Sequence, residues 1–187
     1  MDNEMLIVIA VVAVAVLVVA ALWVAMRKRR TSALRARFGP EYDRVLKTSR
    51  TPAEAEHELK QRESRVKSFA VRPLSREDAD RFGDSWRAVQ AQFVDDPRAA
   101  VLEGDRLIVE VMRARGYPVD NDPDRRLDDL SVDHAHVVNH YRAGREIAAR
   151  HERGQASTED LRQAMVHFRA LFEELVATDR PTARRAS

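Results

Sequence analysis

The stretch MLIVIAVVAVAVLVVAALWVAM, residues 5–26, contains no charged residue and is followed at once by a basic run at residues 27–30. About 20 consecutive apolar residues are enough to cross the hydrocarbon core of a bilayer as a helix. In lipid, a helix satisfies every backbone N–H and C=O group of such a segment internally. Trp23 lies near the charged end, where an indole ring suits the level of the headgroups. Residues 5–26 are therefore predicted to form a single transmembrane helix.

Two other interpretations of this stretch agree less well with its residues. A secretory signal carries its positive charge before the apolar run, whereas Asp2 and Glu4 stand there in this chain. Residues 18–20 fit a small-residue cleavage site, but the apolar run is longer than that of an ordinary signal. A buried core helix rarely stays free of charge over such a length. A membrane span agrees best with the residues.

Positive charge flanks only the C-terminal side of the span. The flanking basic residues are Arg27, Lys28, Arg29, Arg30, Arg35 and Arg37, while residues 1–4 include none. The positive-inside rule therefore predicts an N-terminus outside and residues 27–187 in the cytoplasm. The run from Arg27 to Arg30 is also expected to lie against anionic lipid headgroups, at about 1 kcal/mol per Lys or Arg near the surface.

Length and charge limit the possible functions. The chain has 187 residues, enough for one anchor and one soluble domain. Its 32 basic and 30 acidic residues give a net charge of +2, which argues against a general nucleic-acid-binding protein with a one-sided basic face. The absence of cysteine excludes disulfides and thiolate metal sites.

Helix start signals recur along the rest of the chain. Short helices are predicted at residues 31–38, ending at Gly39 and Pro40, and at residues 41–48. Longer helices are predicted from N-capping residues, with stops at Gly116 and Gly154. The predicted capping residues are Thr51, Ser75, Asp96, Ser131 and Ser157. The polar stretch at residues 117–130 is predicted to be a loop.

Apolar residues in these segments recur in steps of three and four, so each helix has one face to bury. Residues 97–115 are apolar most of the way round, which predicts a central helix. The helix at residues 51–69 has few large apolar residues and is expected outside the bundle. The prediction is an all-α protein with these parts: a tail at 1–4, a transmembrane helix at 5–26, a basic juxtamembrane part at 27–50, a helical bundle at 51–177 and a disordered basic tail at 178–187.

Histidines offer one possible ligand-binding cluster. His134, His136 and His140 lie close in sequence, and His136 and His140 are four residues apart on one helix face. Two such histidines bind a divalent metal when a third ligand, here His167 or a nearby acid, completes the site. The H-E-x-x-H and paired Glu-x-x-His patterns are both missing, so polar histidines at the surface or at a helix start are the favoured interpretation. We also find no phosphate-binding glycine loop and no nucleophile motif, so neither a cofactor nor an enzyme activity is predicted.

Six short stretches carry a resemblance to a known family. They are RFGPEYDR at 37–44, QFVDDP at 92–97, RGYP at 115–118, LSVDH at 130–134, YR at 141–142 and TEDLRQAM at 158–165. On these residues the chain resembles a widespread family of uncharacterised bacterial proteins, each with an N-terminal membrane helix and a helical domain. The resemblance implies a shared fold and single-pass attachment to the inner membrane, and it implies no activity.

These features predict a membrane-tethered protein-interaction module that faces the cytoplasm. Its partners would be the lipid bilayer and a cytoplasmic or membrane protein, and no nucleic acid is expected. The alternative is a metal- or small-ligand-binding helical domain that uses the His/Asp cluster. An interaction patch is predicted at the helix ends near Asp95, Asp96, Tyr117, Asp133, His134 and Arg142.

Overall fold

The computed structural model describes residues 3–119 and 122–177, with side chains from residue 12 onward. Over these residues the chain is all-α, with eight helices and no strand, which confirms the predicted fold class. The helices are α1 (Asn3–Phe38), α2 (Pro40–Thr48), α3 (Pro52–Lys67), α4 (Arg76–Asp95), α5 (Pro97–Ala114), α6 (Pro123–Asp133), α7 (Ala135–Glu152) and α8 (Thr158–Val176). The predicted disordered tail at 178–187 lies outside the described residues.

Most of the predicted helix boundaries are confirmed by side-chain caps. The Thr51 hydroxyl accepts a hydrogen bond from the Glu54 N–H at 3.2 Å, and Asp96 caps α5 by accepting from the Ala99 N–H at 2.9 Å. Ser75 caps α4 in the same way, and Ser157 forms a capping box with Asp160 at the start of α8. Gly116 and Gly154 have φ values of 90° and 72° at helix ends, a region that favours glycine.

The prediction for residues 117–130 was wrong, because this stretch contains most of α6. Asp122 accepts from the N–H groups of Asp124 and Arg125, and Pro123 occupies the first helical turn. Leu127 and Leu130 then face the interior, three residues apart. Ser131 consequently lies inside α6 rather than at a helix start. The next helix, α7, begins only after His134.

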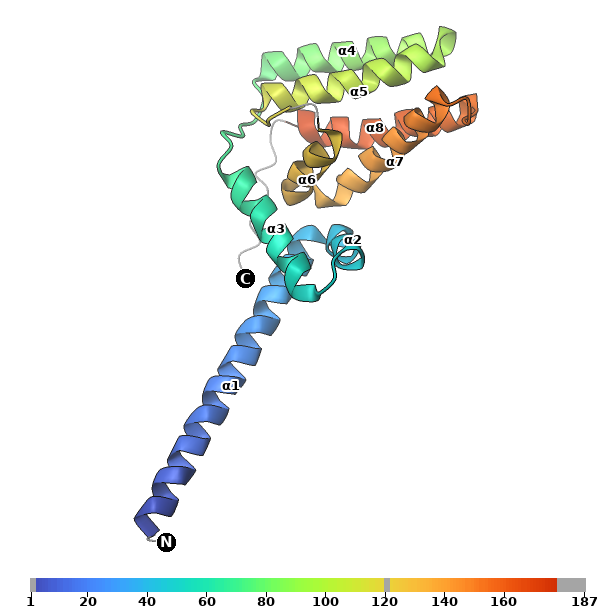
Figure 1. Cartoon of the computed structure of the whole chain (residues 1–187). Helices are drawn as coiled ribbons and strands as arrows, with labels where there is room; N and C mark the ends of the chain where they lie inside the picture. Colours follow the sequence, from blue (N-terminus) through green and yellow to red (C-terminus); the bar gives the residue numbers. More distant parts are fainter. Residues whose placement is uncertain (1–2, 120–121, 178–187) are drawn as a thin grey trace.

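The first helix, α1, is a single element of 36 residues, so residues 5–26 and 31–38, predicted as separate helices, are continuous (Figure 1). No Gly or Pro occurs before residues 39–40, and nothing else in the sequence ends the helix earlier. At 1.5 Å per residue its length is about 54 Å. Figure 1 shows it projecting away from the other helices.

The part of α1 before the basic run is both exposed and apolar. Its large apolar side chains from Val12 to Met26 are each 47–69 % exposed. Residues 5–11 of the predicted membrane segment lie outside the residues whose side chains are described. Among the described residues, no helix has the combination of length and apolar character that crossing a membrane requires.

Four helices, α4, α5, α7 and α8, form what we name the distal bundle. The helix α5 packs against both α4 and α8, and α7 packs against α8, so the predicted central position of residues 97–115 is confirmed. Phe168, Ile108 and Met112 are fully buried in this core, and Trp86 stacks on Phe172 with ring centroids 4.6 Å apart.

A second core lies at the base of α1. The last turns of α1, with α2 and α3, form what we name the proximal unit. Its buried apolar residues are Leu34, Phe38, Tyr42, Val45, Ala55, Leu59 and Val66. As expected, the helix at residues 51–69 lies outside the main bundle. The helix α6 joins the two cores, because Leu130 packs in the distal core and Val132 in the proximal one.

Candidate functional site

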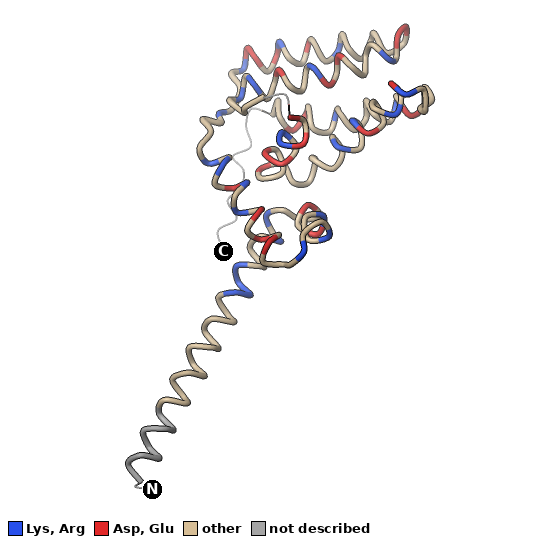
Figure 2. The backbone as a smooth tube through the Cα atoms, viewed as in Figure 1, with Lys and Arg blue, Asp and Glu red and all other residues tan. Residues whose placement is uncertain are grey.

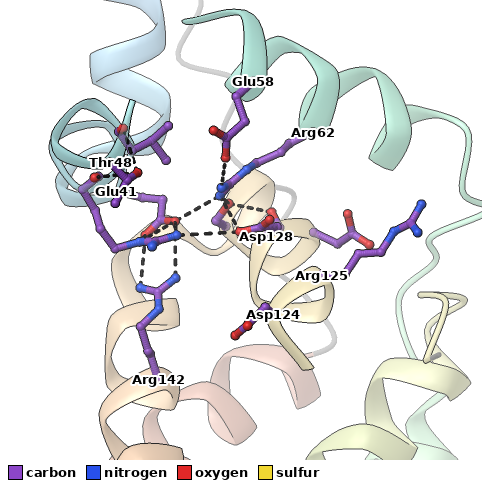
Figure 3. A network of polar contacts seen from close by, with 12 residues as sticks. Glu41, Thr48, Glu58, Arg62, Asp124, Arg125, Asp128 and Arg142 are labelled. Carbon is purple, nitrogen blue, oxygen red and sulfur yellow. Dashed lines mark hydrogen bonds and ion pairs between the residues drawn. The ribbon is translucent and has the colours of Figure 1, made fainter. Parts of the chain in front are cut away.

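Glu41 is the centre of a buried charge network between the proximal unit and the distal bundle (Figure 3). Gly39, with φ 47°, separates α1 from α2 and lets the chain turn. This turn places Glu41 in the first turn of α2, with no exposed surface. A buried carboxylate without partners would cost several kcal/mol, so its surroundings decide whether this arrangement is stable.

Three arginines from three helices meet the Glu41 carboxylate. Arg44 of α2 donates from Nε at 3.0 Å to both oxygens. Arg62 of α3 donates to Oε1 at 3.0 Å. Arg142 of α7 donates to Oε2 at 3.2 Å and to Oε1 at 3.3 Å. The carboxylate therefore ties α2 to α3 and α7 with charge-assisted hydrogen bonds, which are stronger than neutral ones.

Two further acids complete the network around Arg62, which is itself only 4 % exposed. Arg62 pairs with Asp128 of α6 at 2.8 Å and also with Glu58 of its own helix. Arg44 lies 3.7 Å from the same Asp128. The network thus combines three acids with three arginines, so its formal charge is balanced.

Two acids of the network have pKa values shifted in opposite directions. Burial by itself raises the pKa of Glu41, but hydrogen bonds from Arg44 and the charges of Arg142 and Arg44 outweigh it, so this pKa lies below its usual value. Burial raises the pKa of Asp128 above its usual value even though Arg62 and Arg44 oppose the shift. The arginines therefore favour the ionised form of Glu41.

An open pocket of about 590 Å³ adjoins this network, between α2, α3, α6 and α7. Its lining includes four arginines, Arg44, Arg62, Arg142 and Arg145, and four acids, Glu58, Asp124, Asp128 and Glu146. Such a balanced lining favours neither an anion nor a metal cation. The arrangement is suited to hold helices in place rather than to bind a charged ligand.

Two more arginines reinforce the same boundary. Arg37 of α1 contacts Glu63 of α3 at 2.5 Å and Asp133 at the end of α6 at 3.2 Å. Arg65 of α3 pairs with the buried Asp129 of α6 at 2.6 Å. We name the set of contacts made by Arg37, Arg44, Arg62, Arg65 and Arg142 with their acids the arginine seam.

The predicted histidine cluster is divided between two places. His140 Nδ1 lies 3.1 Å from His167 Nδ1, while His134 and His136 both approach Glu174, at 3.4 and 3.5 Å. Glu174 and His167 are seven residues apart on α8, about 10 Å along the helix, so the histidines of α7 meet different turns. Within residues 3–119 and 122–177, no group of three or more His, Cys, Asp or Glu is arranged to hold a metal ion.

The predicted interaction patch is also not brought together. Asp95 and Asp96 lie where α4 meets α5, whereas Tyr117 follows the opposite end of α5, about 27 Å away along an 18-residue helix. Tyr117 and His134 are both buried, with ring centroids 6.4 Å apart.

The other two predicted patch residues belong to the seam. Asp133 pairs with Arg37, and Arg142 binds Glu41. The six residues therefore do not form one surface.

The predicted membrane-surface residues occupy one exposed band of α1. Figure 2 shows a blue band of basic residues on α1 between its uncharged part and the proximal unit, and the basic run at residues 27–30 is exposed there. Arg27 lies over the Trp23 ring, 5.5 Å from its centroid. Over the described part of the chain, these four side chains form no ion pair, so their charges are available to a partner outside the protein.

The central residue of the seam, Glu41, was not among the predicted site residues. A signal was present, because Glu41 precedes the buried Val45 by four residues and so shares the apolar face of its helix. An acid on such a face needs cationic partners. Arg142, 101 positions away, could not be identified as one of them from local spacing.

Comparison of the chain with protein-family models, with curated proteins and with solved structures finds no match. Membership of the bacterial family that the chain resembles stays a prediction.

Proposed function

We propose that the protein is a membrane-tethered helical interaction module. In this proposal residues 5–26 cross the inner membrane with the N-terminus outside, and residues 27–187 face the cytoplasm. The uncharged stretch of the length required for a bilayer and the basic run on one side only support this topology. Tethering raises the effective concentration of a weakly binding domain at the membrane surface.

The observation that carries the proposal is the continuity of α1. The same helix exposes its apolar residues up to Met26, then its basic band, and finally buries Leu34 and Phe38 in the proximal core. In water, a row of exposed apolar side chains of this size would be unfavourable. In lipid, the same row is covered, and the folded domain begins one helical turn beyond the basic band.

The arginine seam then sets the position of the distal bundle relative to the anchor. Arg37 of α1 bonds to α3 and to the end of α6, and Glu41 of α2 bonds to α7. These directional contacts, added to the two cores, favour one orientation of the bundle over a freely swinging one. A fixed orientation suits a domain that presents one face to a partner at the membrane.

We place the partner-binding face at the groove between α4 and α8. This groove, of about 190 Å³, is lined by the apolar side chains of Phe93, Met165 and Val166 and by Gln90, Arg162 and Arg169. Val166 is 50 % exposed. Within the described part of the chain, the two arginines pair with exposed acids of their own helix, Glu159 and Glu173, and such pairs are worth little. An amphipathic partner helix with acidic flanks has the complementary chemistry.

Anchoring is tested by placing charge at the middle of the apolar segment. Two central charges in the variant Ala15→Arg/Val16→Arg cost about 5–7 kcal/mol of insertion free energy, so the variant is expected in the soluble fraction after alkaline extraction of membranes. The matched control Ala15→Leu/Val16→Leu keeps the segment apolar and is expected to stay in the membrane fraction with the wild type. Equal extraction of wild type and arginine variant would contradict the proposal.

The partner-binding face is tested by photocrosslinking in native membranes. A photoreactive residue at Val166 is expected to give one product of defined mass, which Arg169→Glu removes by reversing the charge of one lining residue. The control places the same photoreactive residue at position 155, where Gln155 is exposed before α8. This control is expected to give none of the product. Identical products from both positions, or no product from Val166, would count against this face.

A further inference from the structure

A pocket of about 430 Å³ lies between α1 and α3, next to the basic band. On the α1 side it is lined by Trp23, Met26, Arg27 and Arg30, and on the α3 side by Ala53, Glu56, His57 and Lys60. The last turns of α1 pack with α3 in the proximal unit, and Thr31, next to Arg30, hydrogen-bonds to Glu56 of α3 beside the pocket. This pocket is separate from the arginine seam.

The cations of this pocket lack counter-ions. Over the described residues, Arg27, Arg30 and Lys60 form no ion pair, although the pocket brings them to one place. The one acid among the described lining residues, Glu56, accepts a hydrogen bond from the Thr31 hydroxyl at 2.6 Å and lies 3.5 Å from the Tyr42 hydroxyl. Glu56 is therefore engaged by the protein. The pocket keeps an excess of positive charge, unlike the balanced pocket beside Glu41.

An apolar surface strip of α1 adjoins this pocket. The strip consists of Val12, Ala15, Val16, Val19, Ala20 and Trp23, spaced in steps of three and four, so all lie on one face of the helix. Trp23 belongs to both the strip and the basic pocket. One face of α1 therefore carries a purely apolar strip that ends in a cluster of unpaired cations.

We propose that this combined surface binds one anionic phospholipid, with the phosphate held by Arg27, Arg30 and Lys60 and one acyl chain lying along the apolar strip. A free phosphate ion is also an anion, but it has no acyl chain to lie on the strip. Lys60 is the distinctive residue, because it comes from the folded domain and so joins the bound headgroup to the proximal unit. This inference rests on the proposed membrane anchoring.

The test uses the full chain in a neutral detergent, with retained lipid counted by native mass spectrometry. Phosphatidylglycerol, phosphatidylcholine with the same acyl chains, and inorganic phosphate are the three probes. One phosphatidylglycerol per chain is expected, bound more tightly than either other probe. The variant Arg30→Ala/Lys60→Ala is expected to bind it about 30-fold more weakly, at about 1 kcal/mol per cation.

The matched control is Lys67→Ala/Arg76→Ala, which removes two exposed cations from the far end of α3 and the start of α4. It is expected to bind phosphatidylglycerol as the wild type does. Equal retention of the two lipids by the wild type, equal binding by wild type and Arg30→Ala/Lys60→Ala, or phosphate binding as tight as that of the lipid would each overturn the inference.

Membrane fractionation of the same strains separates the two proposals. If the wild-type chain is in membranes but retains no anionic lipid, the lipid site alone is wrong. If the wild-type chain is found outside membranes, the anchoring itself is wrong.

Discussion

In the distal bundle, apolar side chains such as Phe168, Ile108 and Met112 fill the space between helices, whereas the boundary with the proximal unit is built around a buried carboxylate and its arginines. Among the residues whose side chains the structure describes, the buried polar ones are Glu41, Arg62, Asp129, Ser131 and His134. All five lie in α2, α3, α6 or the turn before α7, outside the four helices of the distal bundle.

The apolar core and the charged boundary contribute to the structure in different ways. Apolar burial supplies stability roughly in proportion to area and without direction. Hydrogen-bonded ion pairs add little net stability when buried but are directional, and the loss of one partner is costly. We infer that the distal core stabilises the bundle and that the arginine seam sets how the bundle stands on α1.

The largest expected effect comes from removing the charge at the centre of the seam. Glu41→Gln leaves Arg62 and Arg142 without their shared carboxylate, and breaking a buried pair in this way costs about 3–5 kcal/mol of the free energy of unfolding. Amide hydrogen exchange should rise first in α2 and α3, while α5 and α8 keep their protection.

The control for this change is Glu58→Gln. Glu58 pairs with the same Arg62, but its side chain is 42 % exposed, so its loss is expected to cost no more than about 1 kcal/mol. If the two variants lose the same stability, or if α5 and α8 lose protection together with α2 and α3, then the seam and the distal core are not distinct.

A smaller effect is expected from a single methyl group in the distal core. A Cβ on Gly144 would lie 2.6 Å from Cε1 of Phe168 and 3.2 Å from the Ala164 carbonyl oxygen. Gly144→Ala should therefore force α7 and α8 apart and cost about 1–3 kcal/mol, measured by denaturant unfolding.

Gly104→Ala is the matched variant. Its Cβ would meet the nearest atom, the Met165 sulfur, at 3.4 Å, an ordinary contact. Alanine also has the higher helix propensity by about 1 kcal/mol, so this variant is expected to be neutral or slightly more stable. A loss equal to that of Gly144→Ala would show that the distal core is not packed as described.

The smallest expected effect is a pH dependence at the junction of the two regions. Burial and the charge of Arg115 lower the pKa of His134 below its usual value of 6.5, although Glu174 opposes the shift. As the pH falls below about 6.5, the unfolded chain takes up a proton that the folded chain does not, so stability decreases until the pH reaches the folded pKa.

Replacing the titrating group checks this effect. His134→Gln is expected to reduce the slope of the unfolding free energy against pH just below 6.5, whereas His136→Gln, at an exposed position, is expected to leave it unchanged. His167, whose pKa is also lowered by burial, keeps its contribution in both variants. A slope in His134→Gln equal to that of the wild type would contradict the prediction.

Local sequence signals were sufficient to predict where most of the helices begin. Caps such as Thr51 and Ser157 act within three residues of themselves, so their effect is visible in sequence. Asp122 and Pro123 form the same pattern as Asp96 and Pro97, an N-capping Asp followed by Pro. The pattern that predicted the start of α5 would therefore also have predicted the start of α6. The polar composition around it obscured the apolar spacing of Leu127 and Leu130.

The arrangement of the site depends on contacts that no local pattern contains. Arg142 was singled out at a helix end, but its binding to Glu41 joins positions 101 residues apart. The spacing correctly placed His136 and His140 on one helix. They contact different turns of α8, however, because His136 lies near Glu174 and His140 lies near His167. Whether neighbours on one helix act together depends on the helix packed against them.

Topology at the membrane is the most direct test of the proposed function. The chain has no cysteine, so single cysteines can be introduced on an empty background and labelled with a membrane-impermeant maleimide. Asn3→Cys should be labelled in cells whose outer envelope has been removed and whose inner membrane is intact. Gln155→Cys should be labelled only after the inner membrane is permeabilised, and Val16→Cys should be labelled in neither condition. Labelling of Gln155→Cys before permeabilisation, or of Val16→Cys as readily as Gln155→Cys, would contradict an anchored module that faces the cytoplasm.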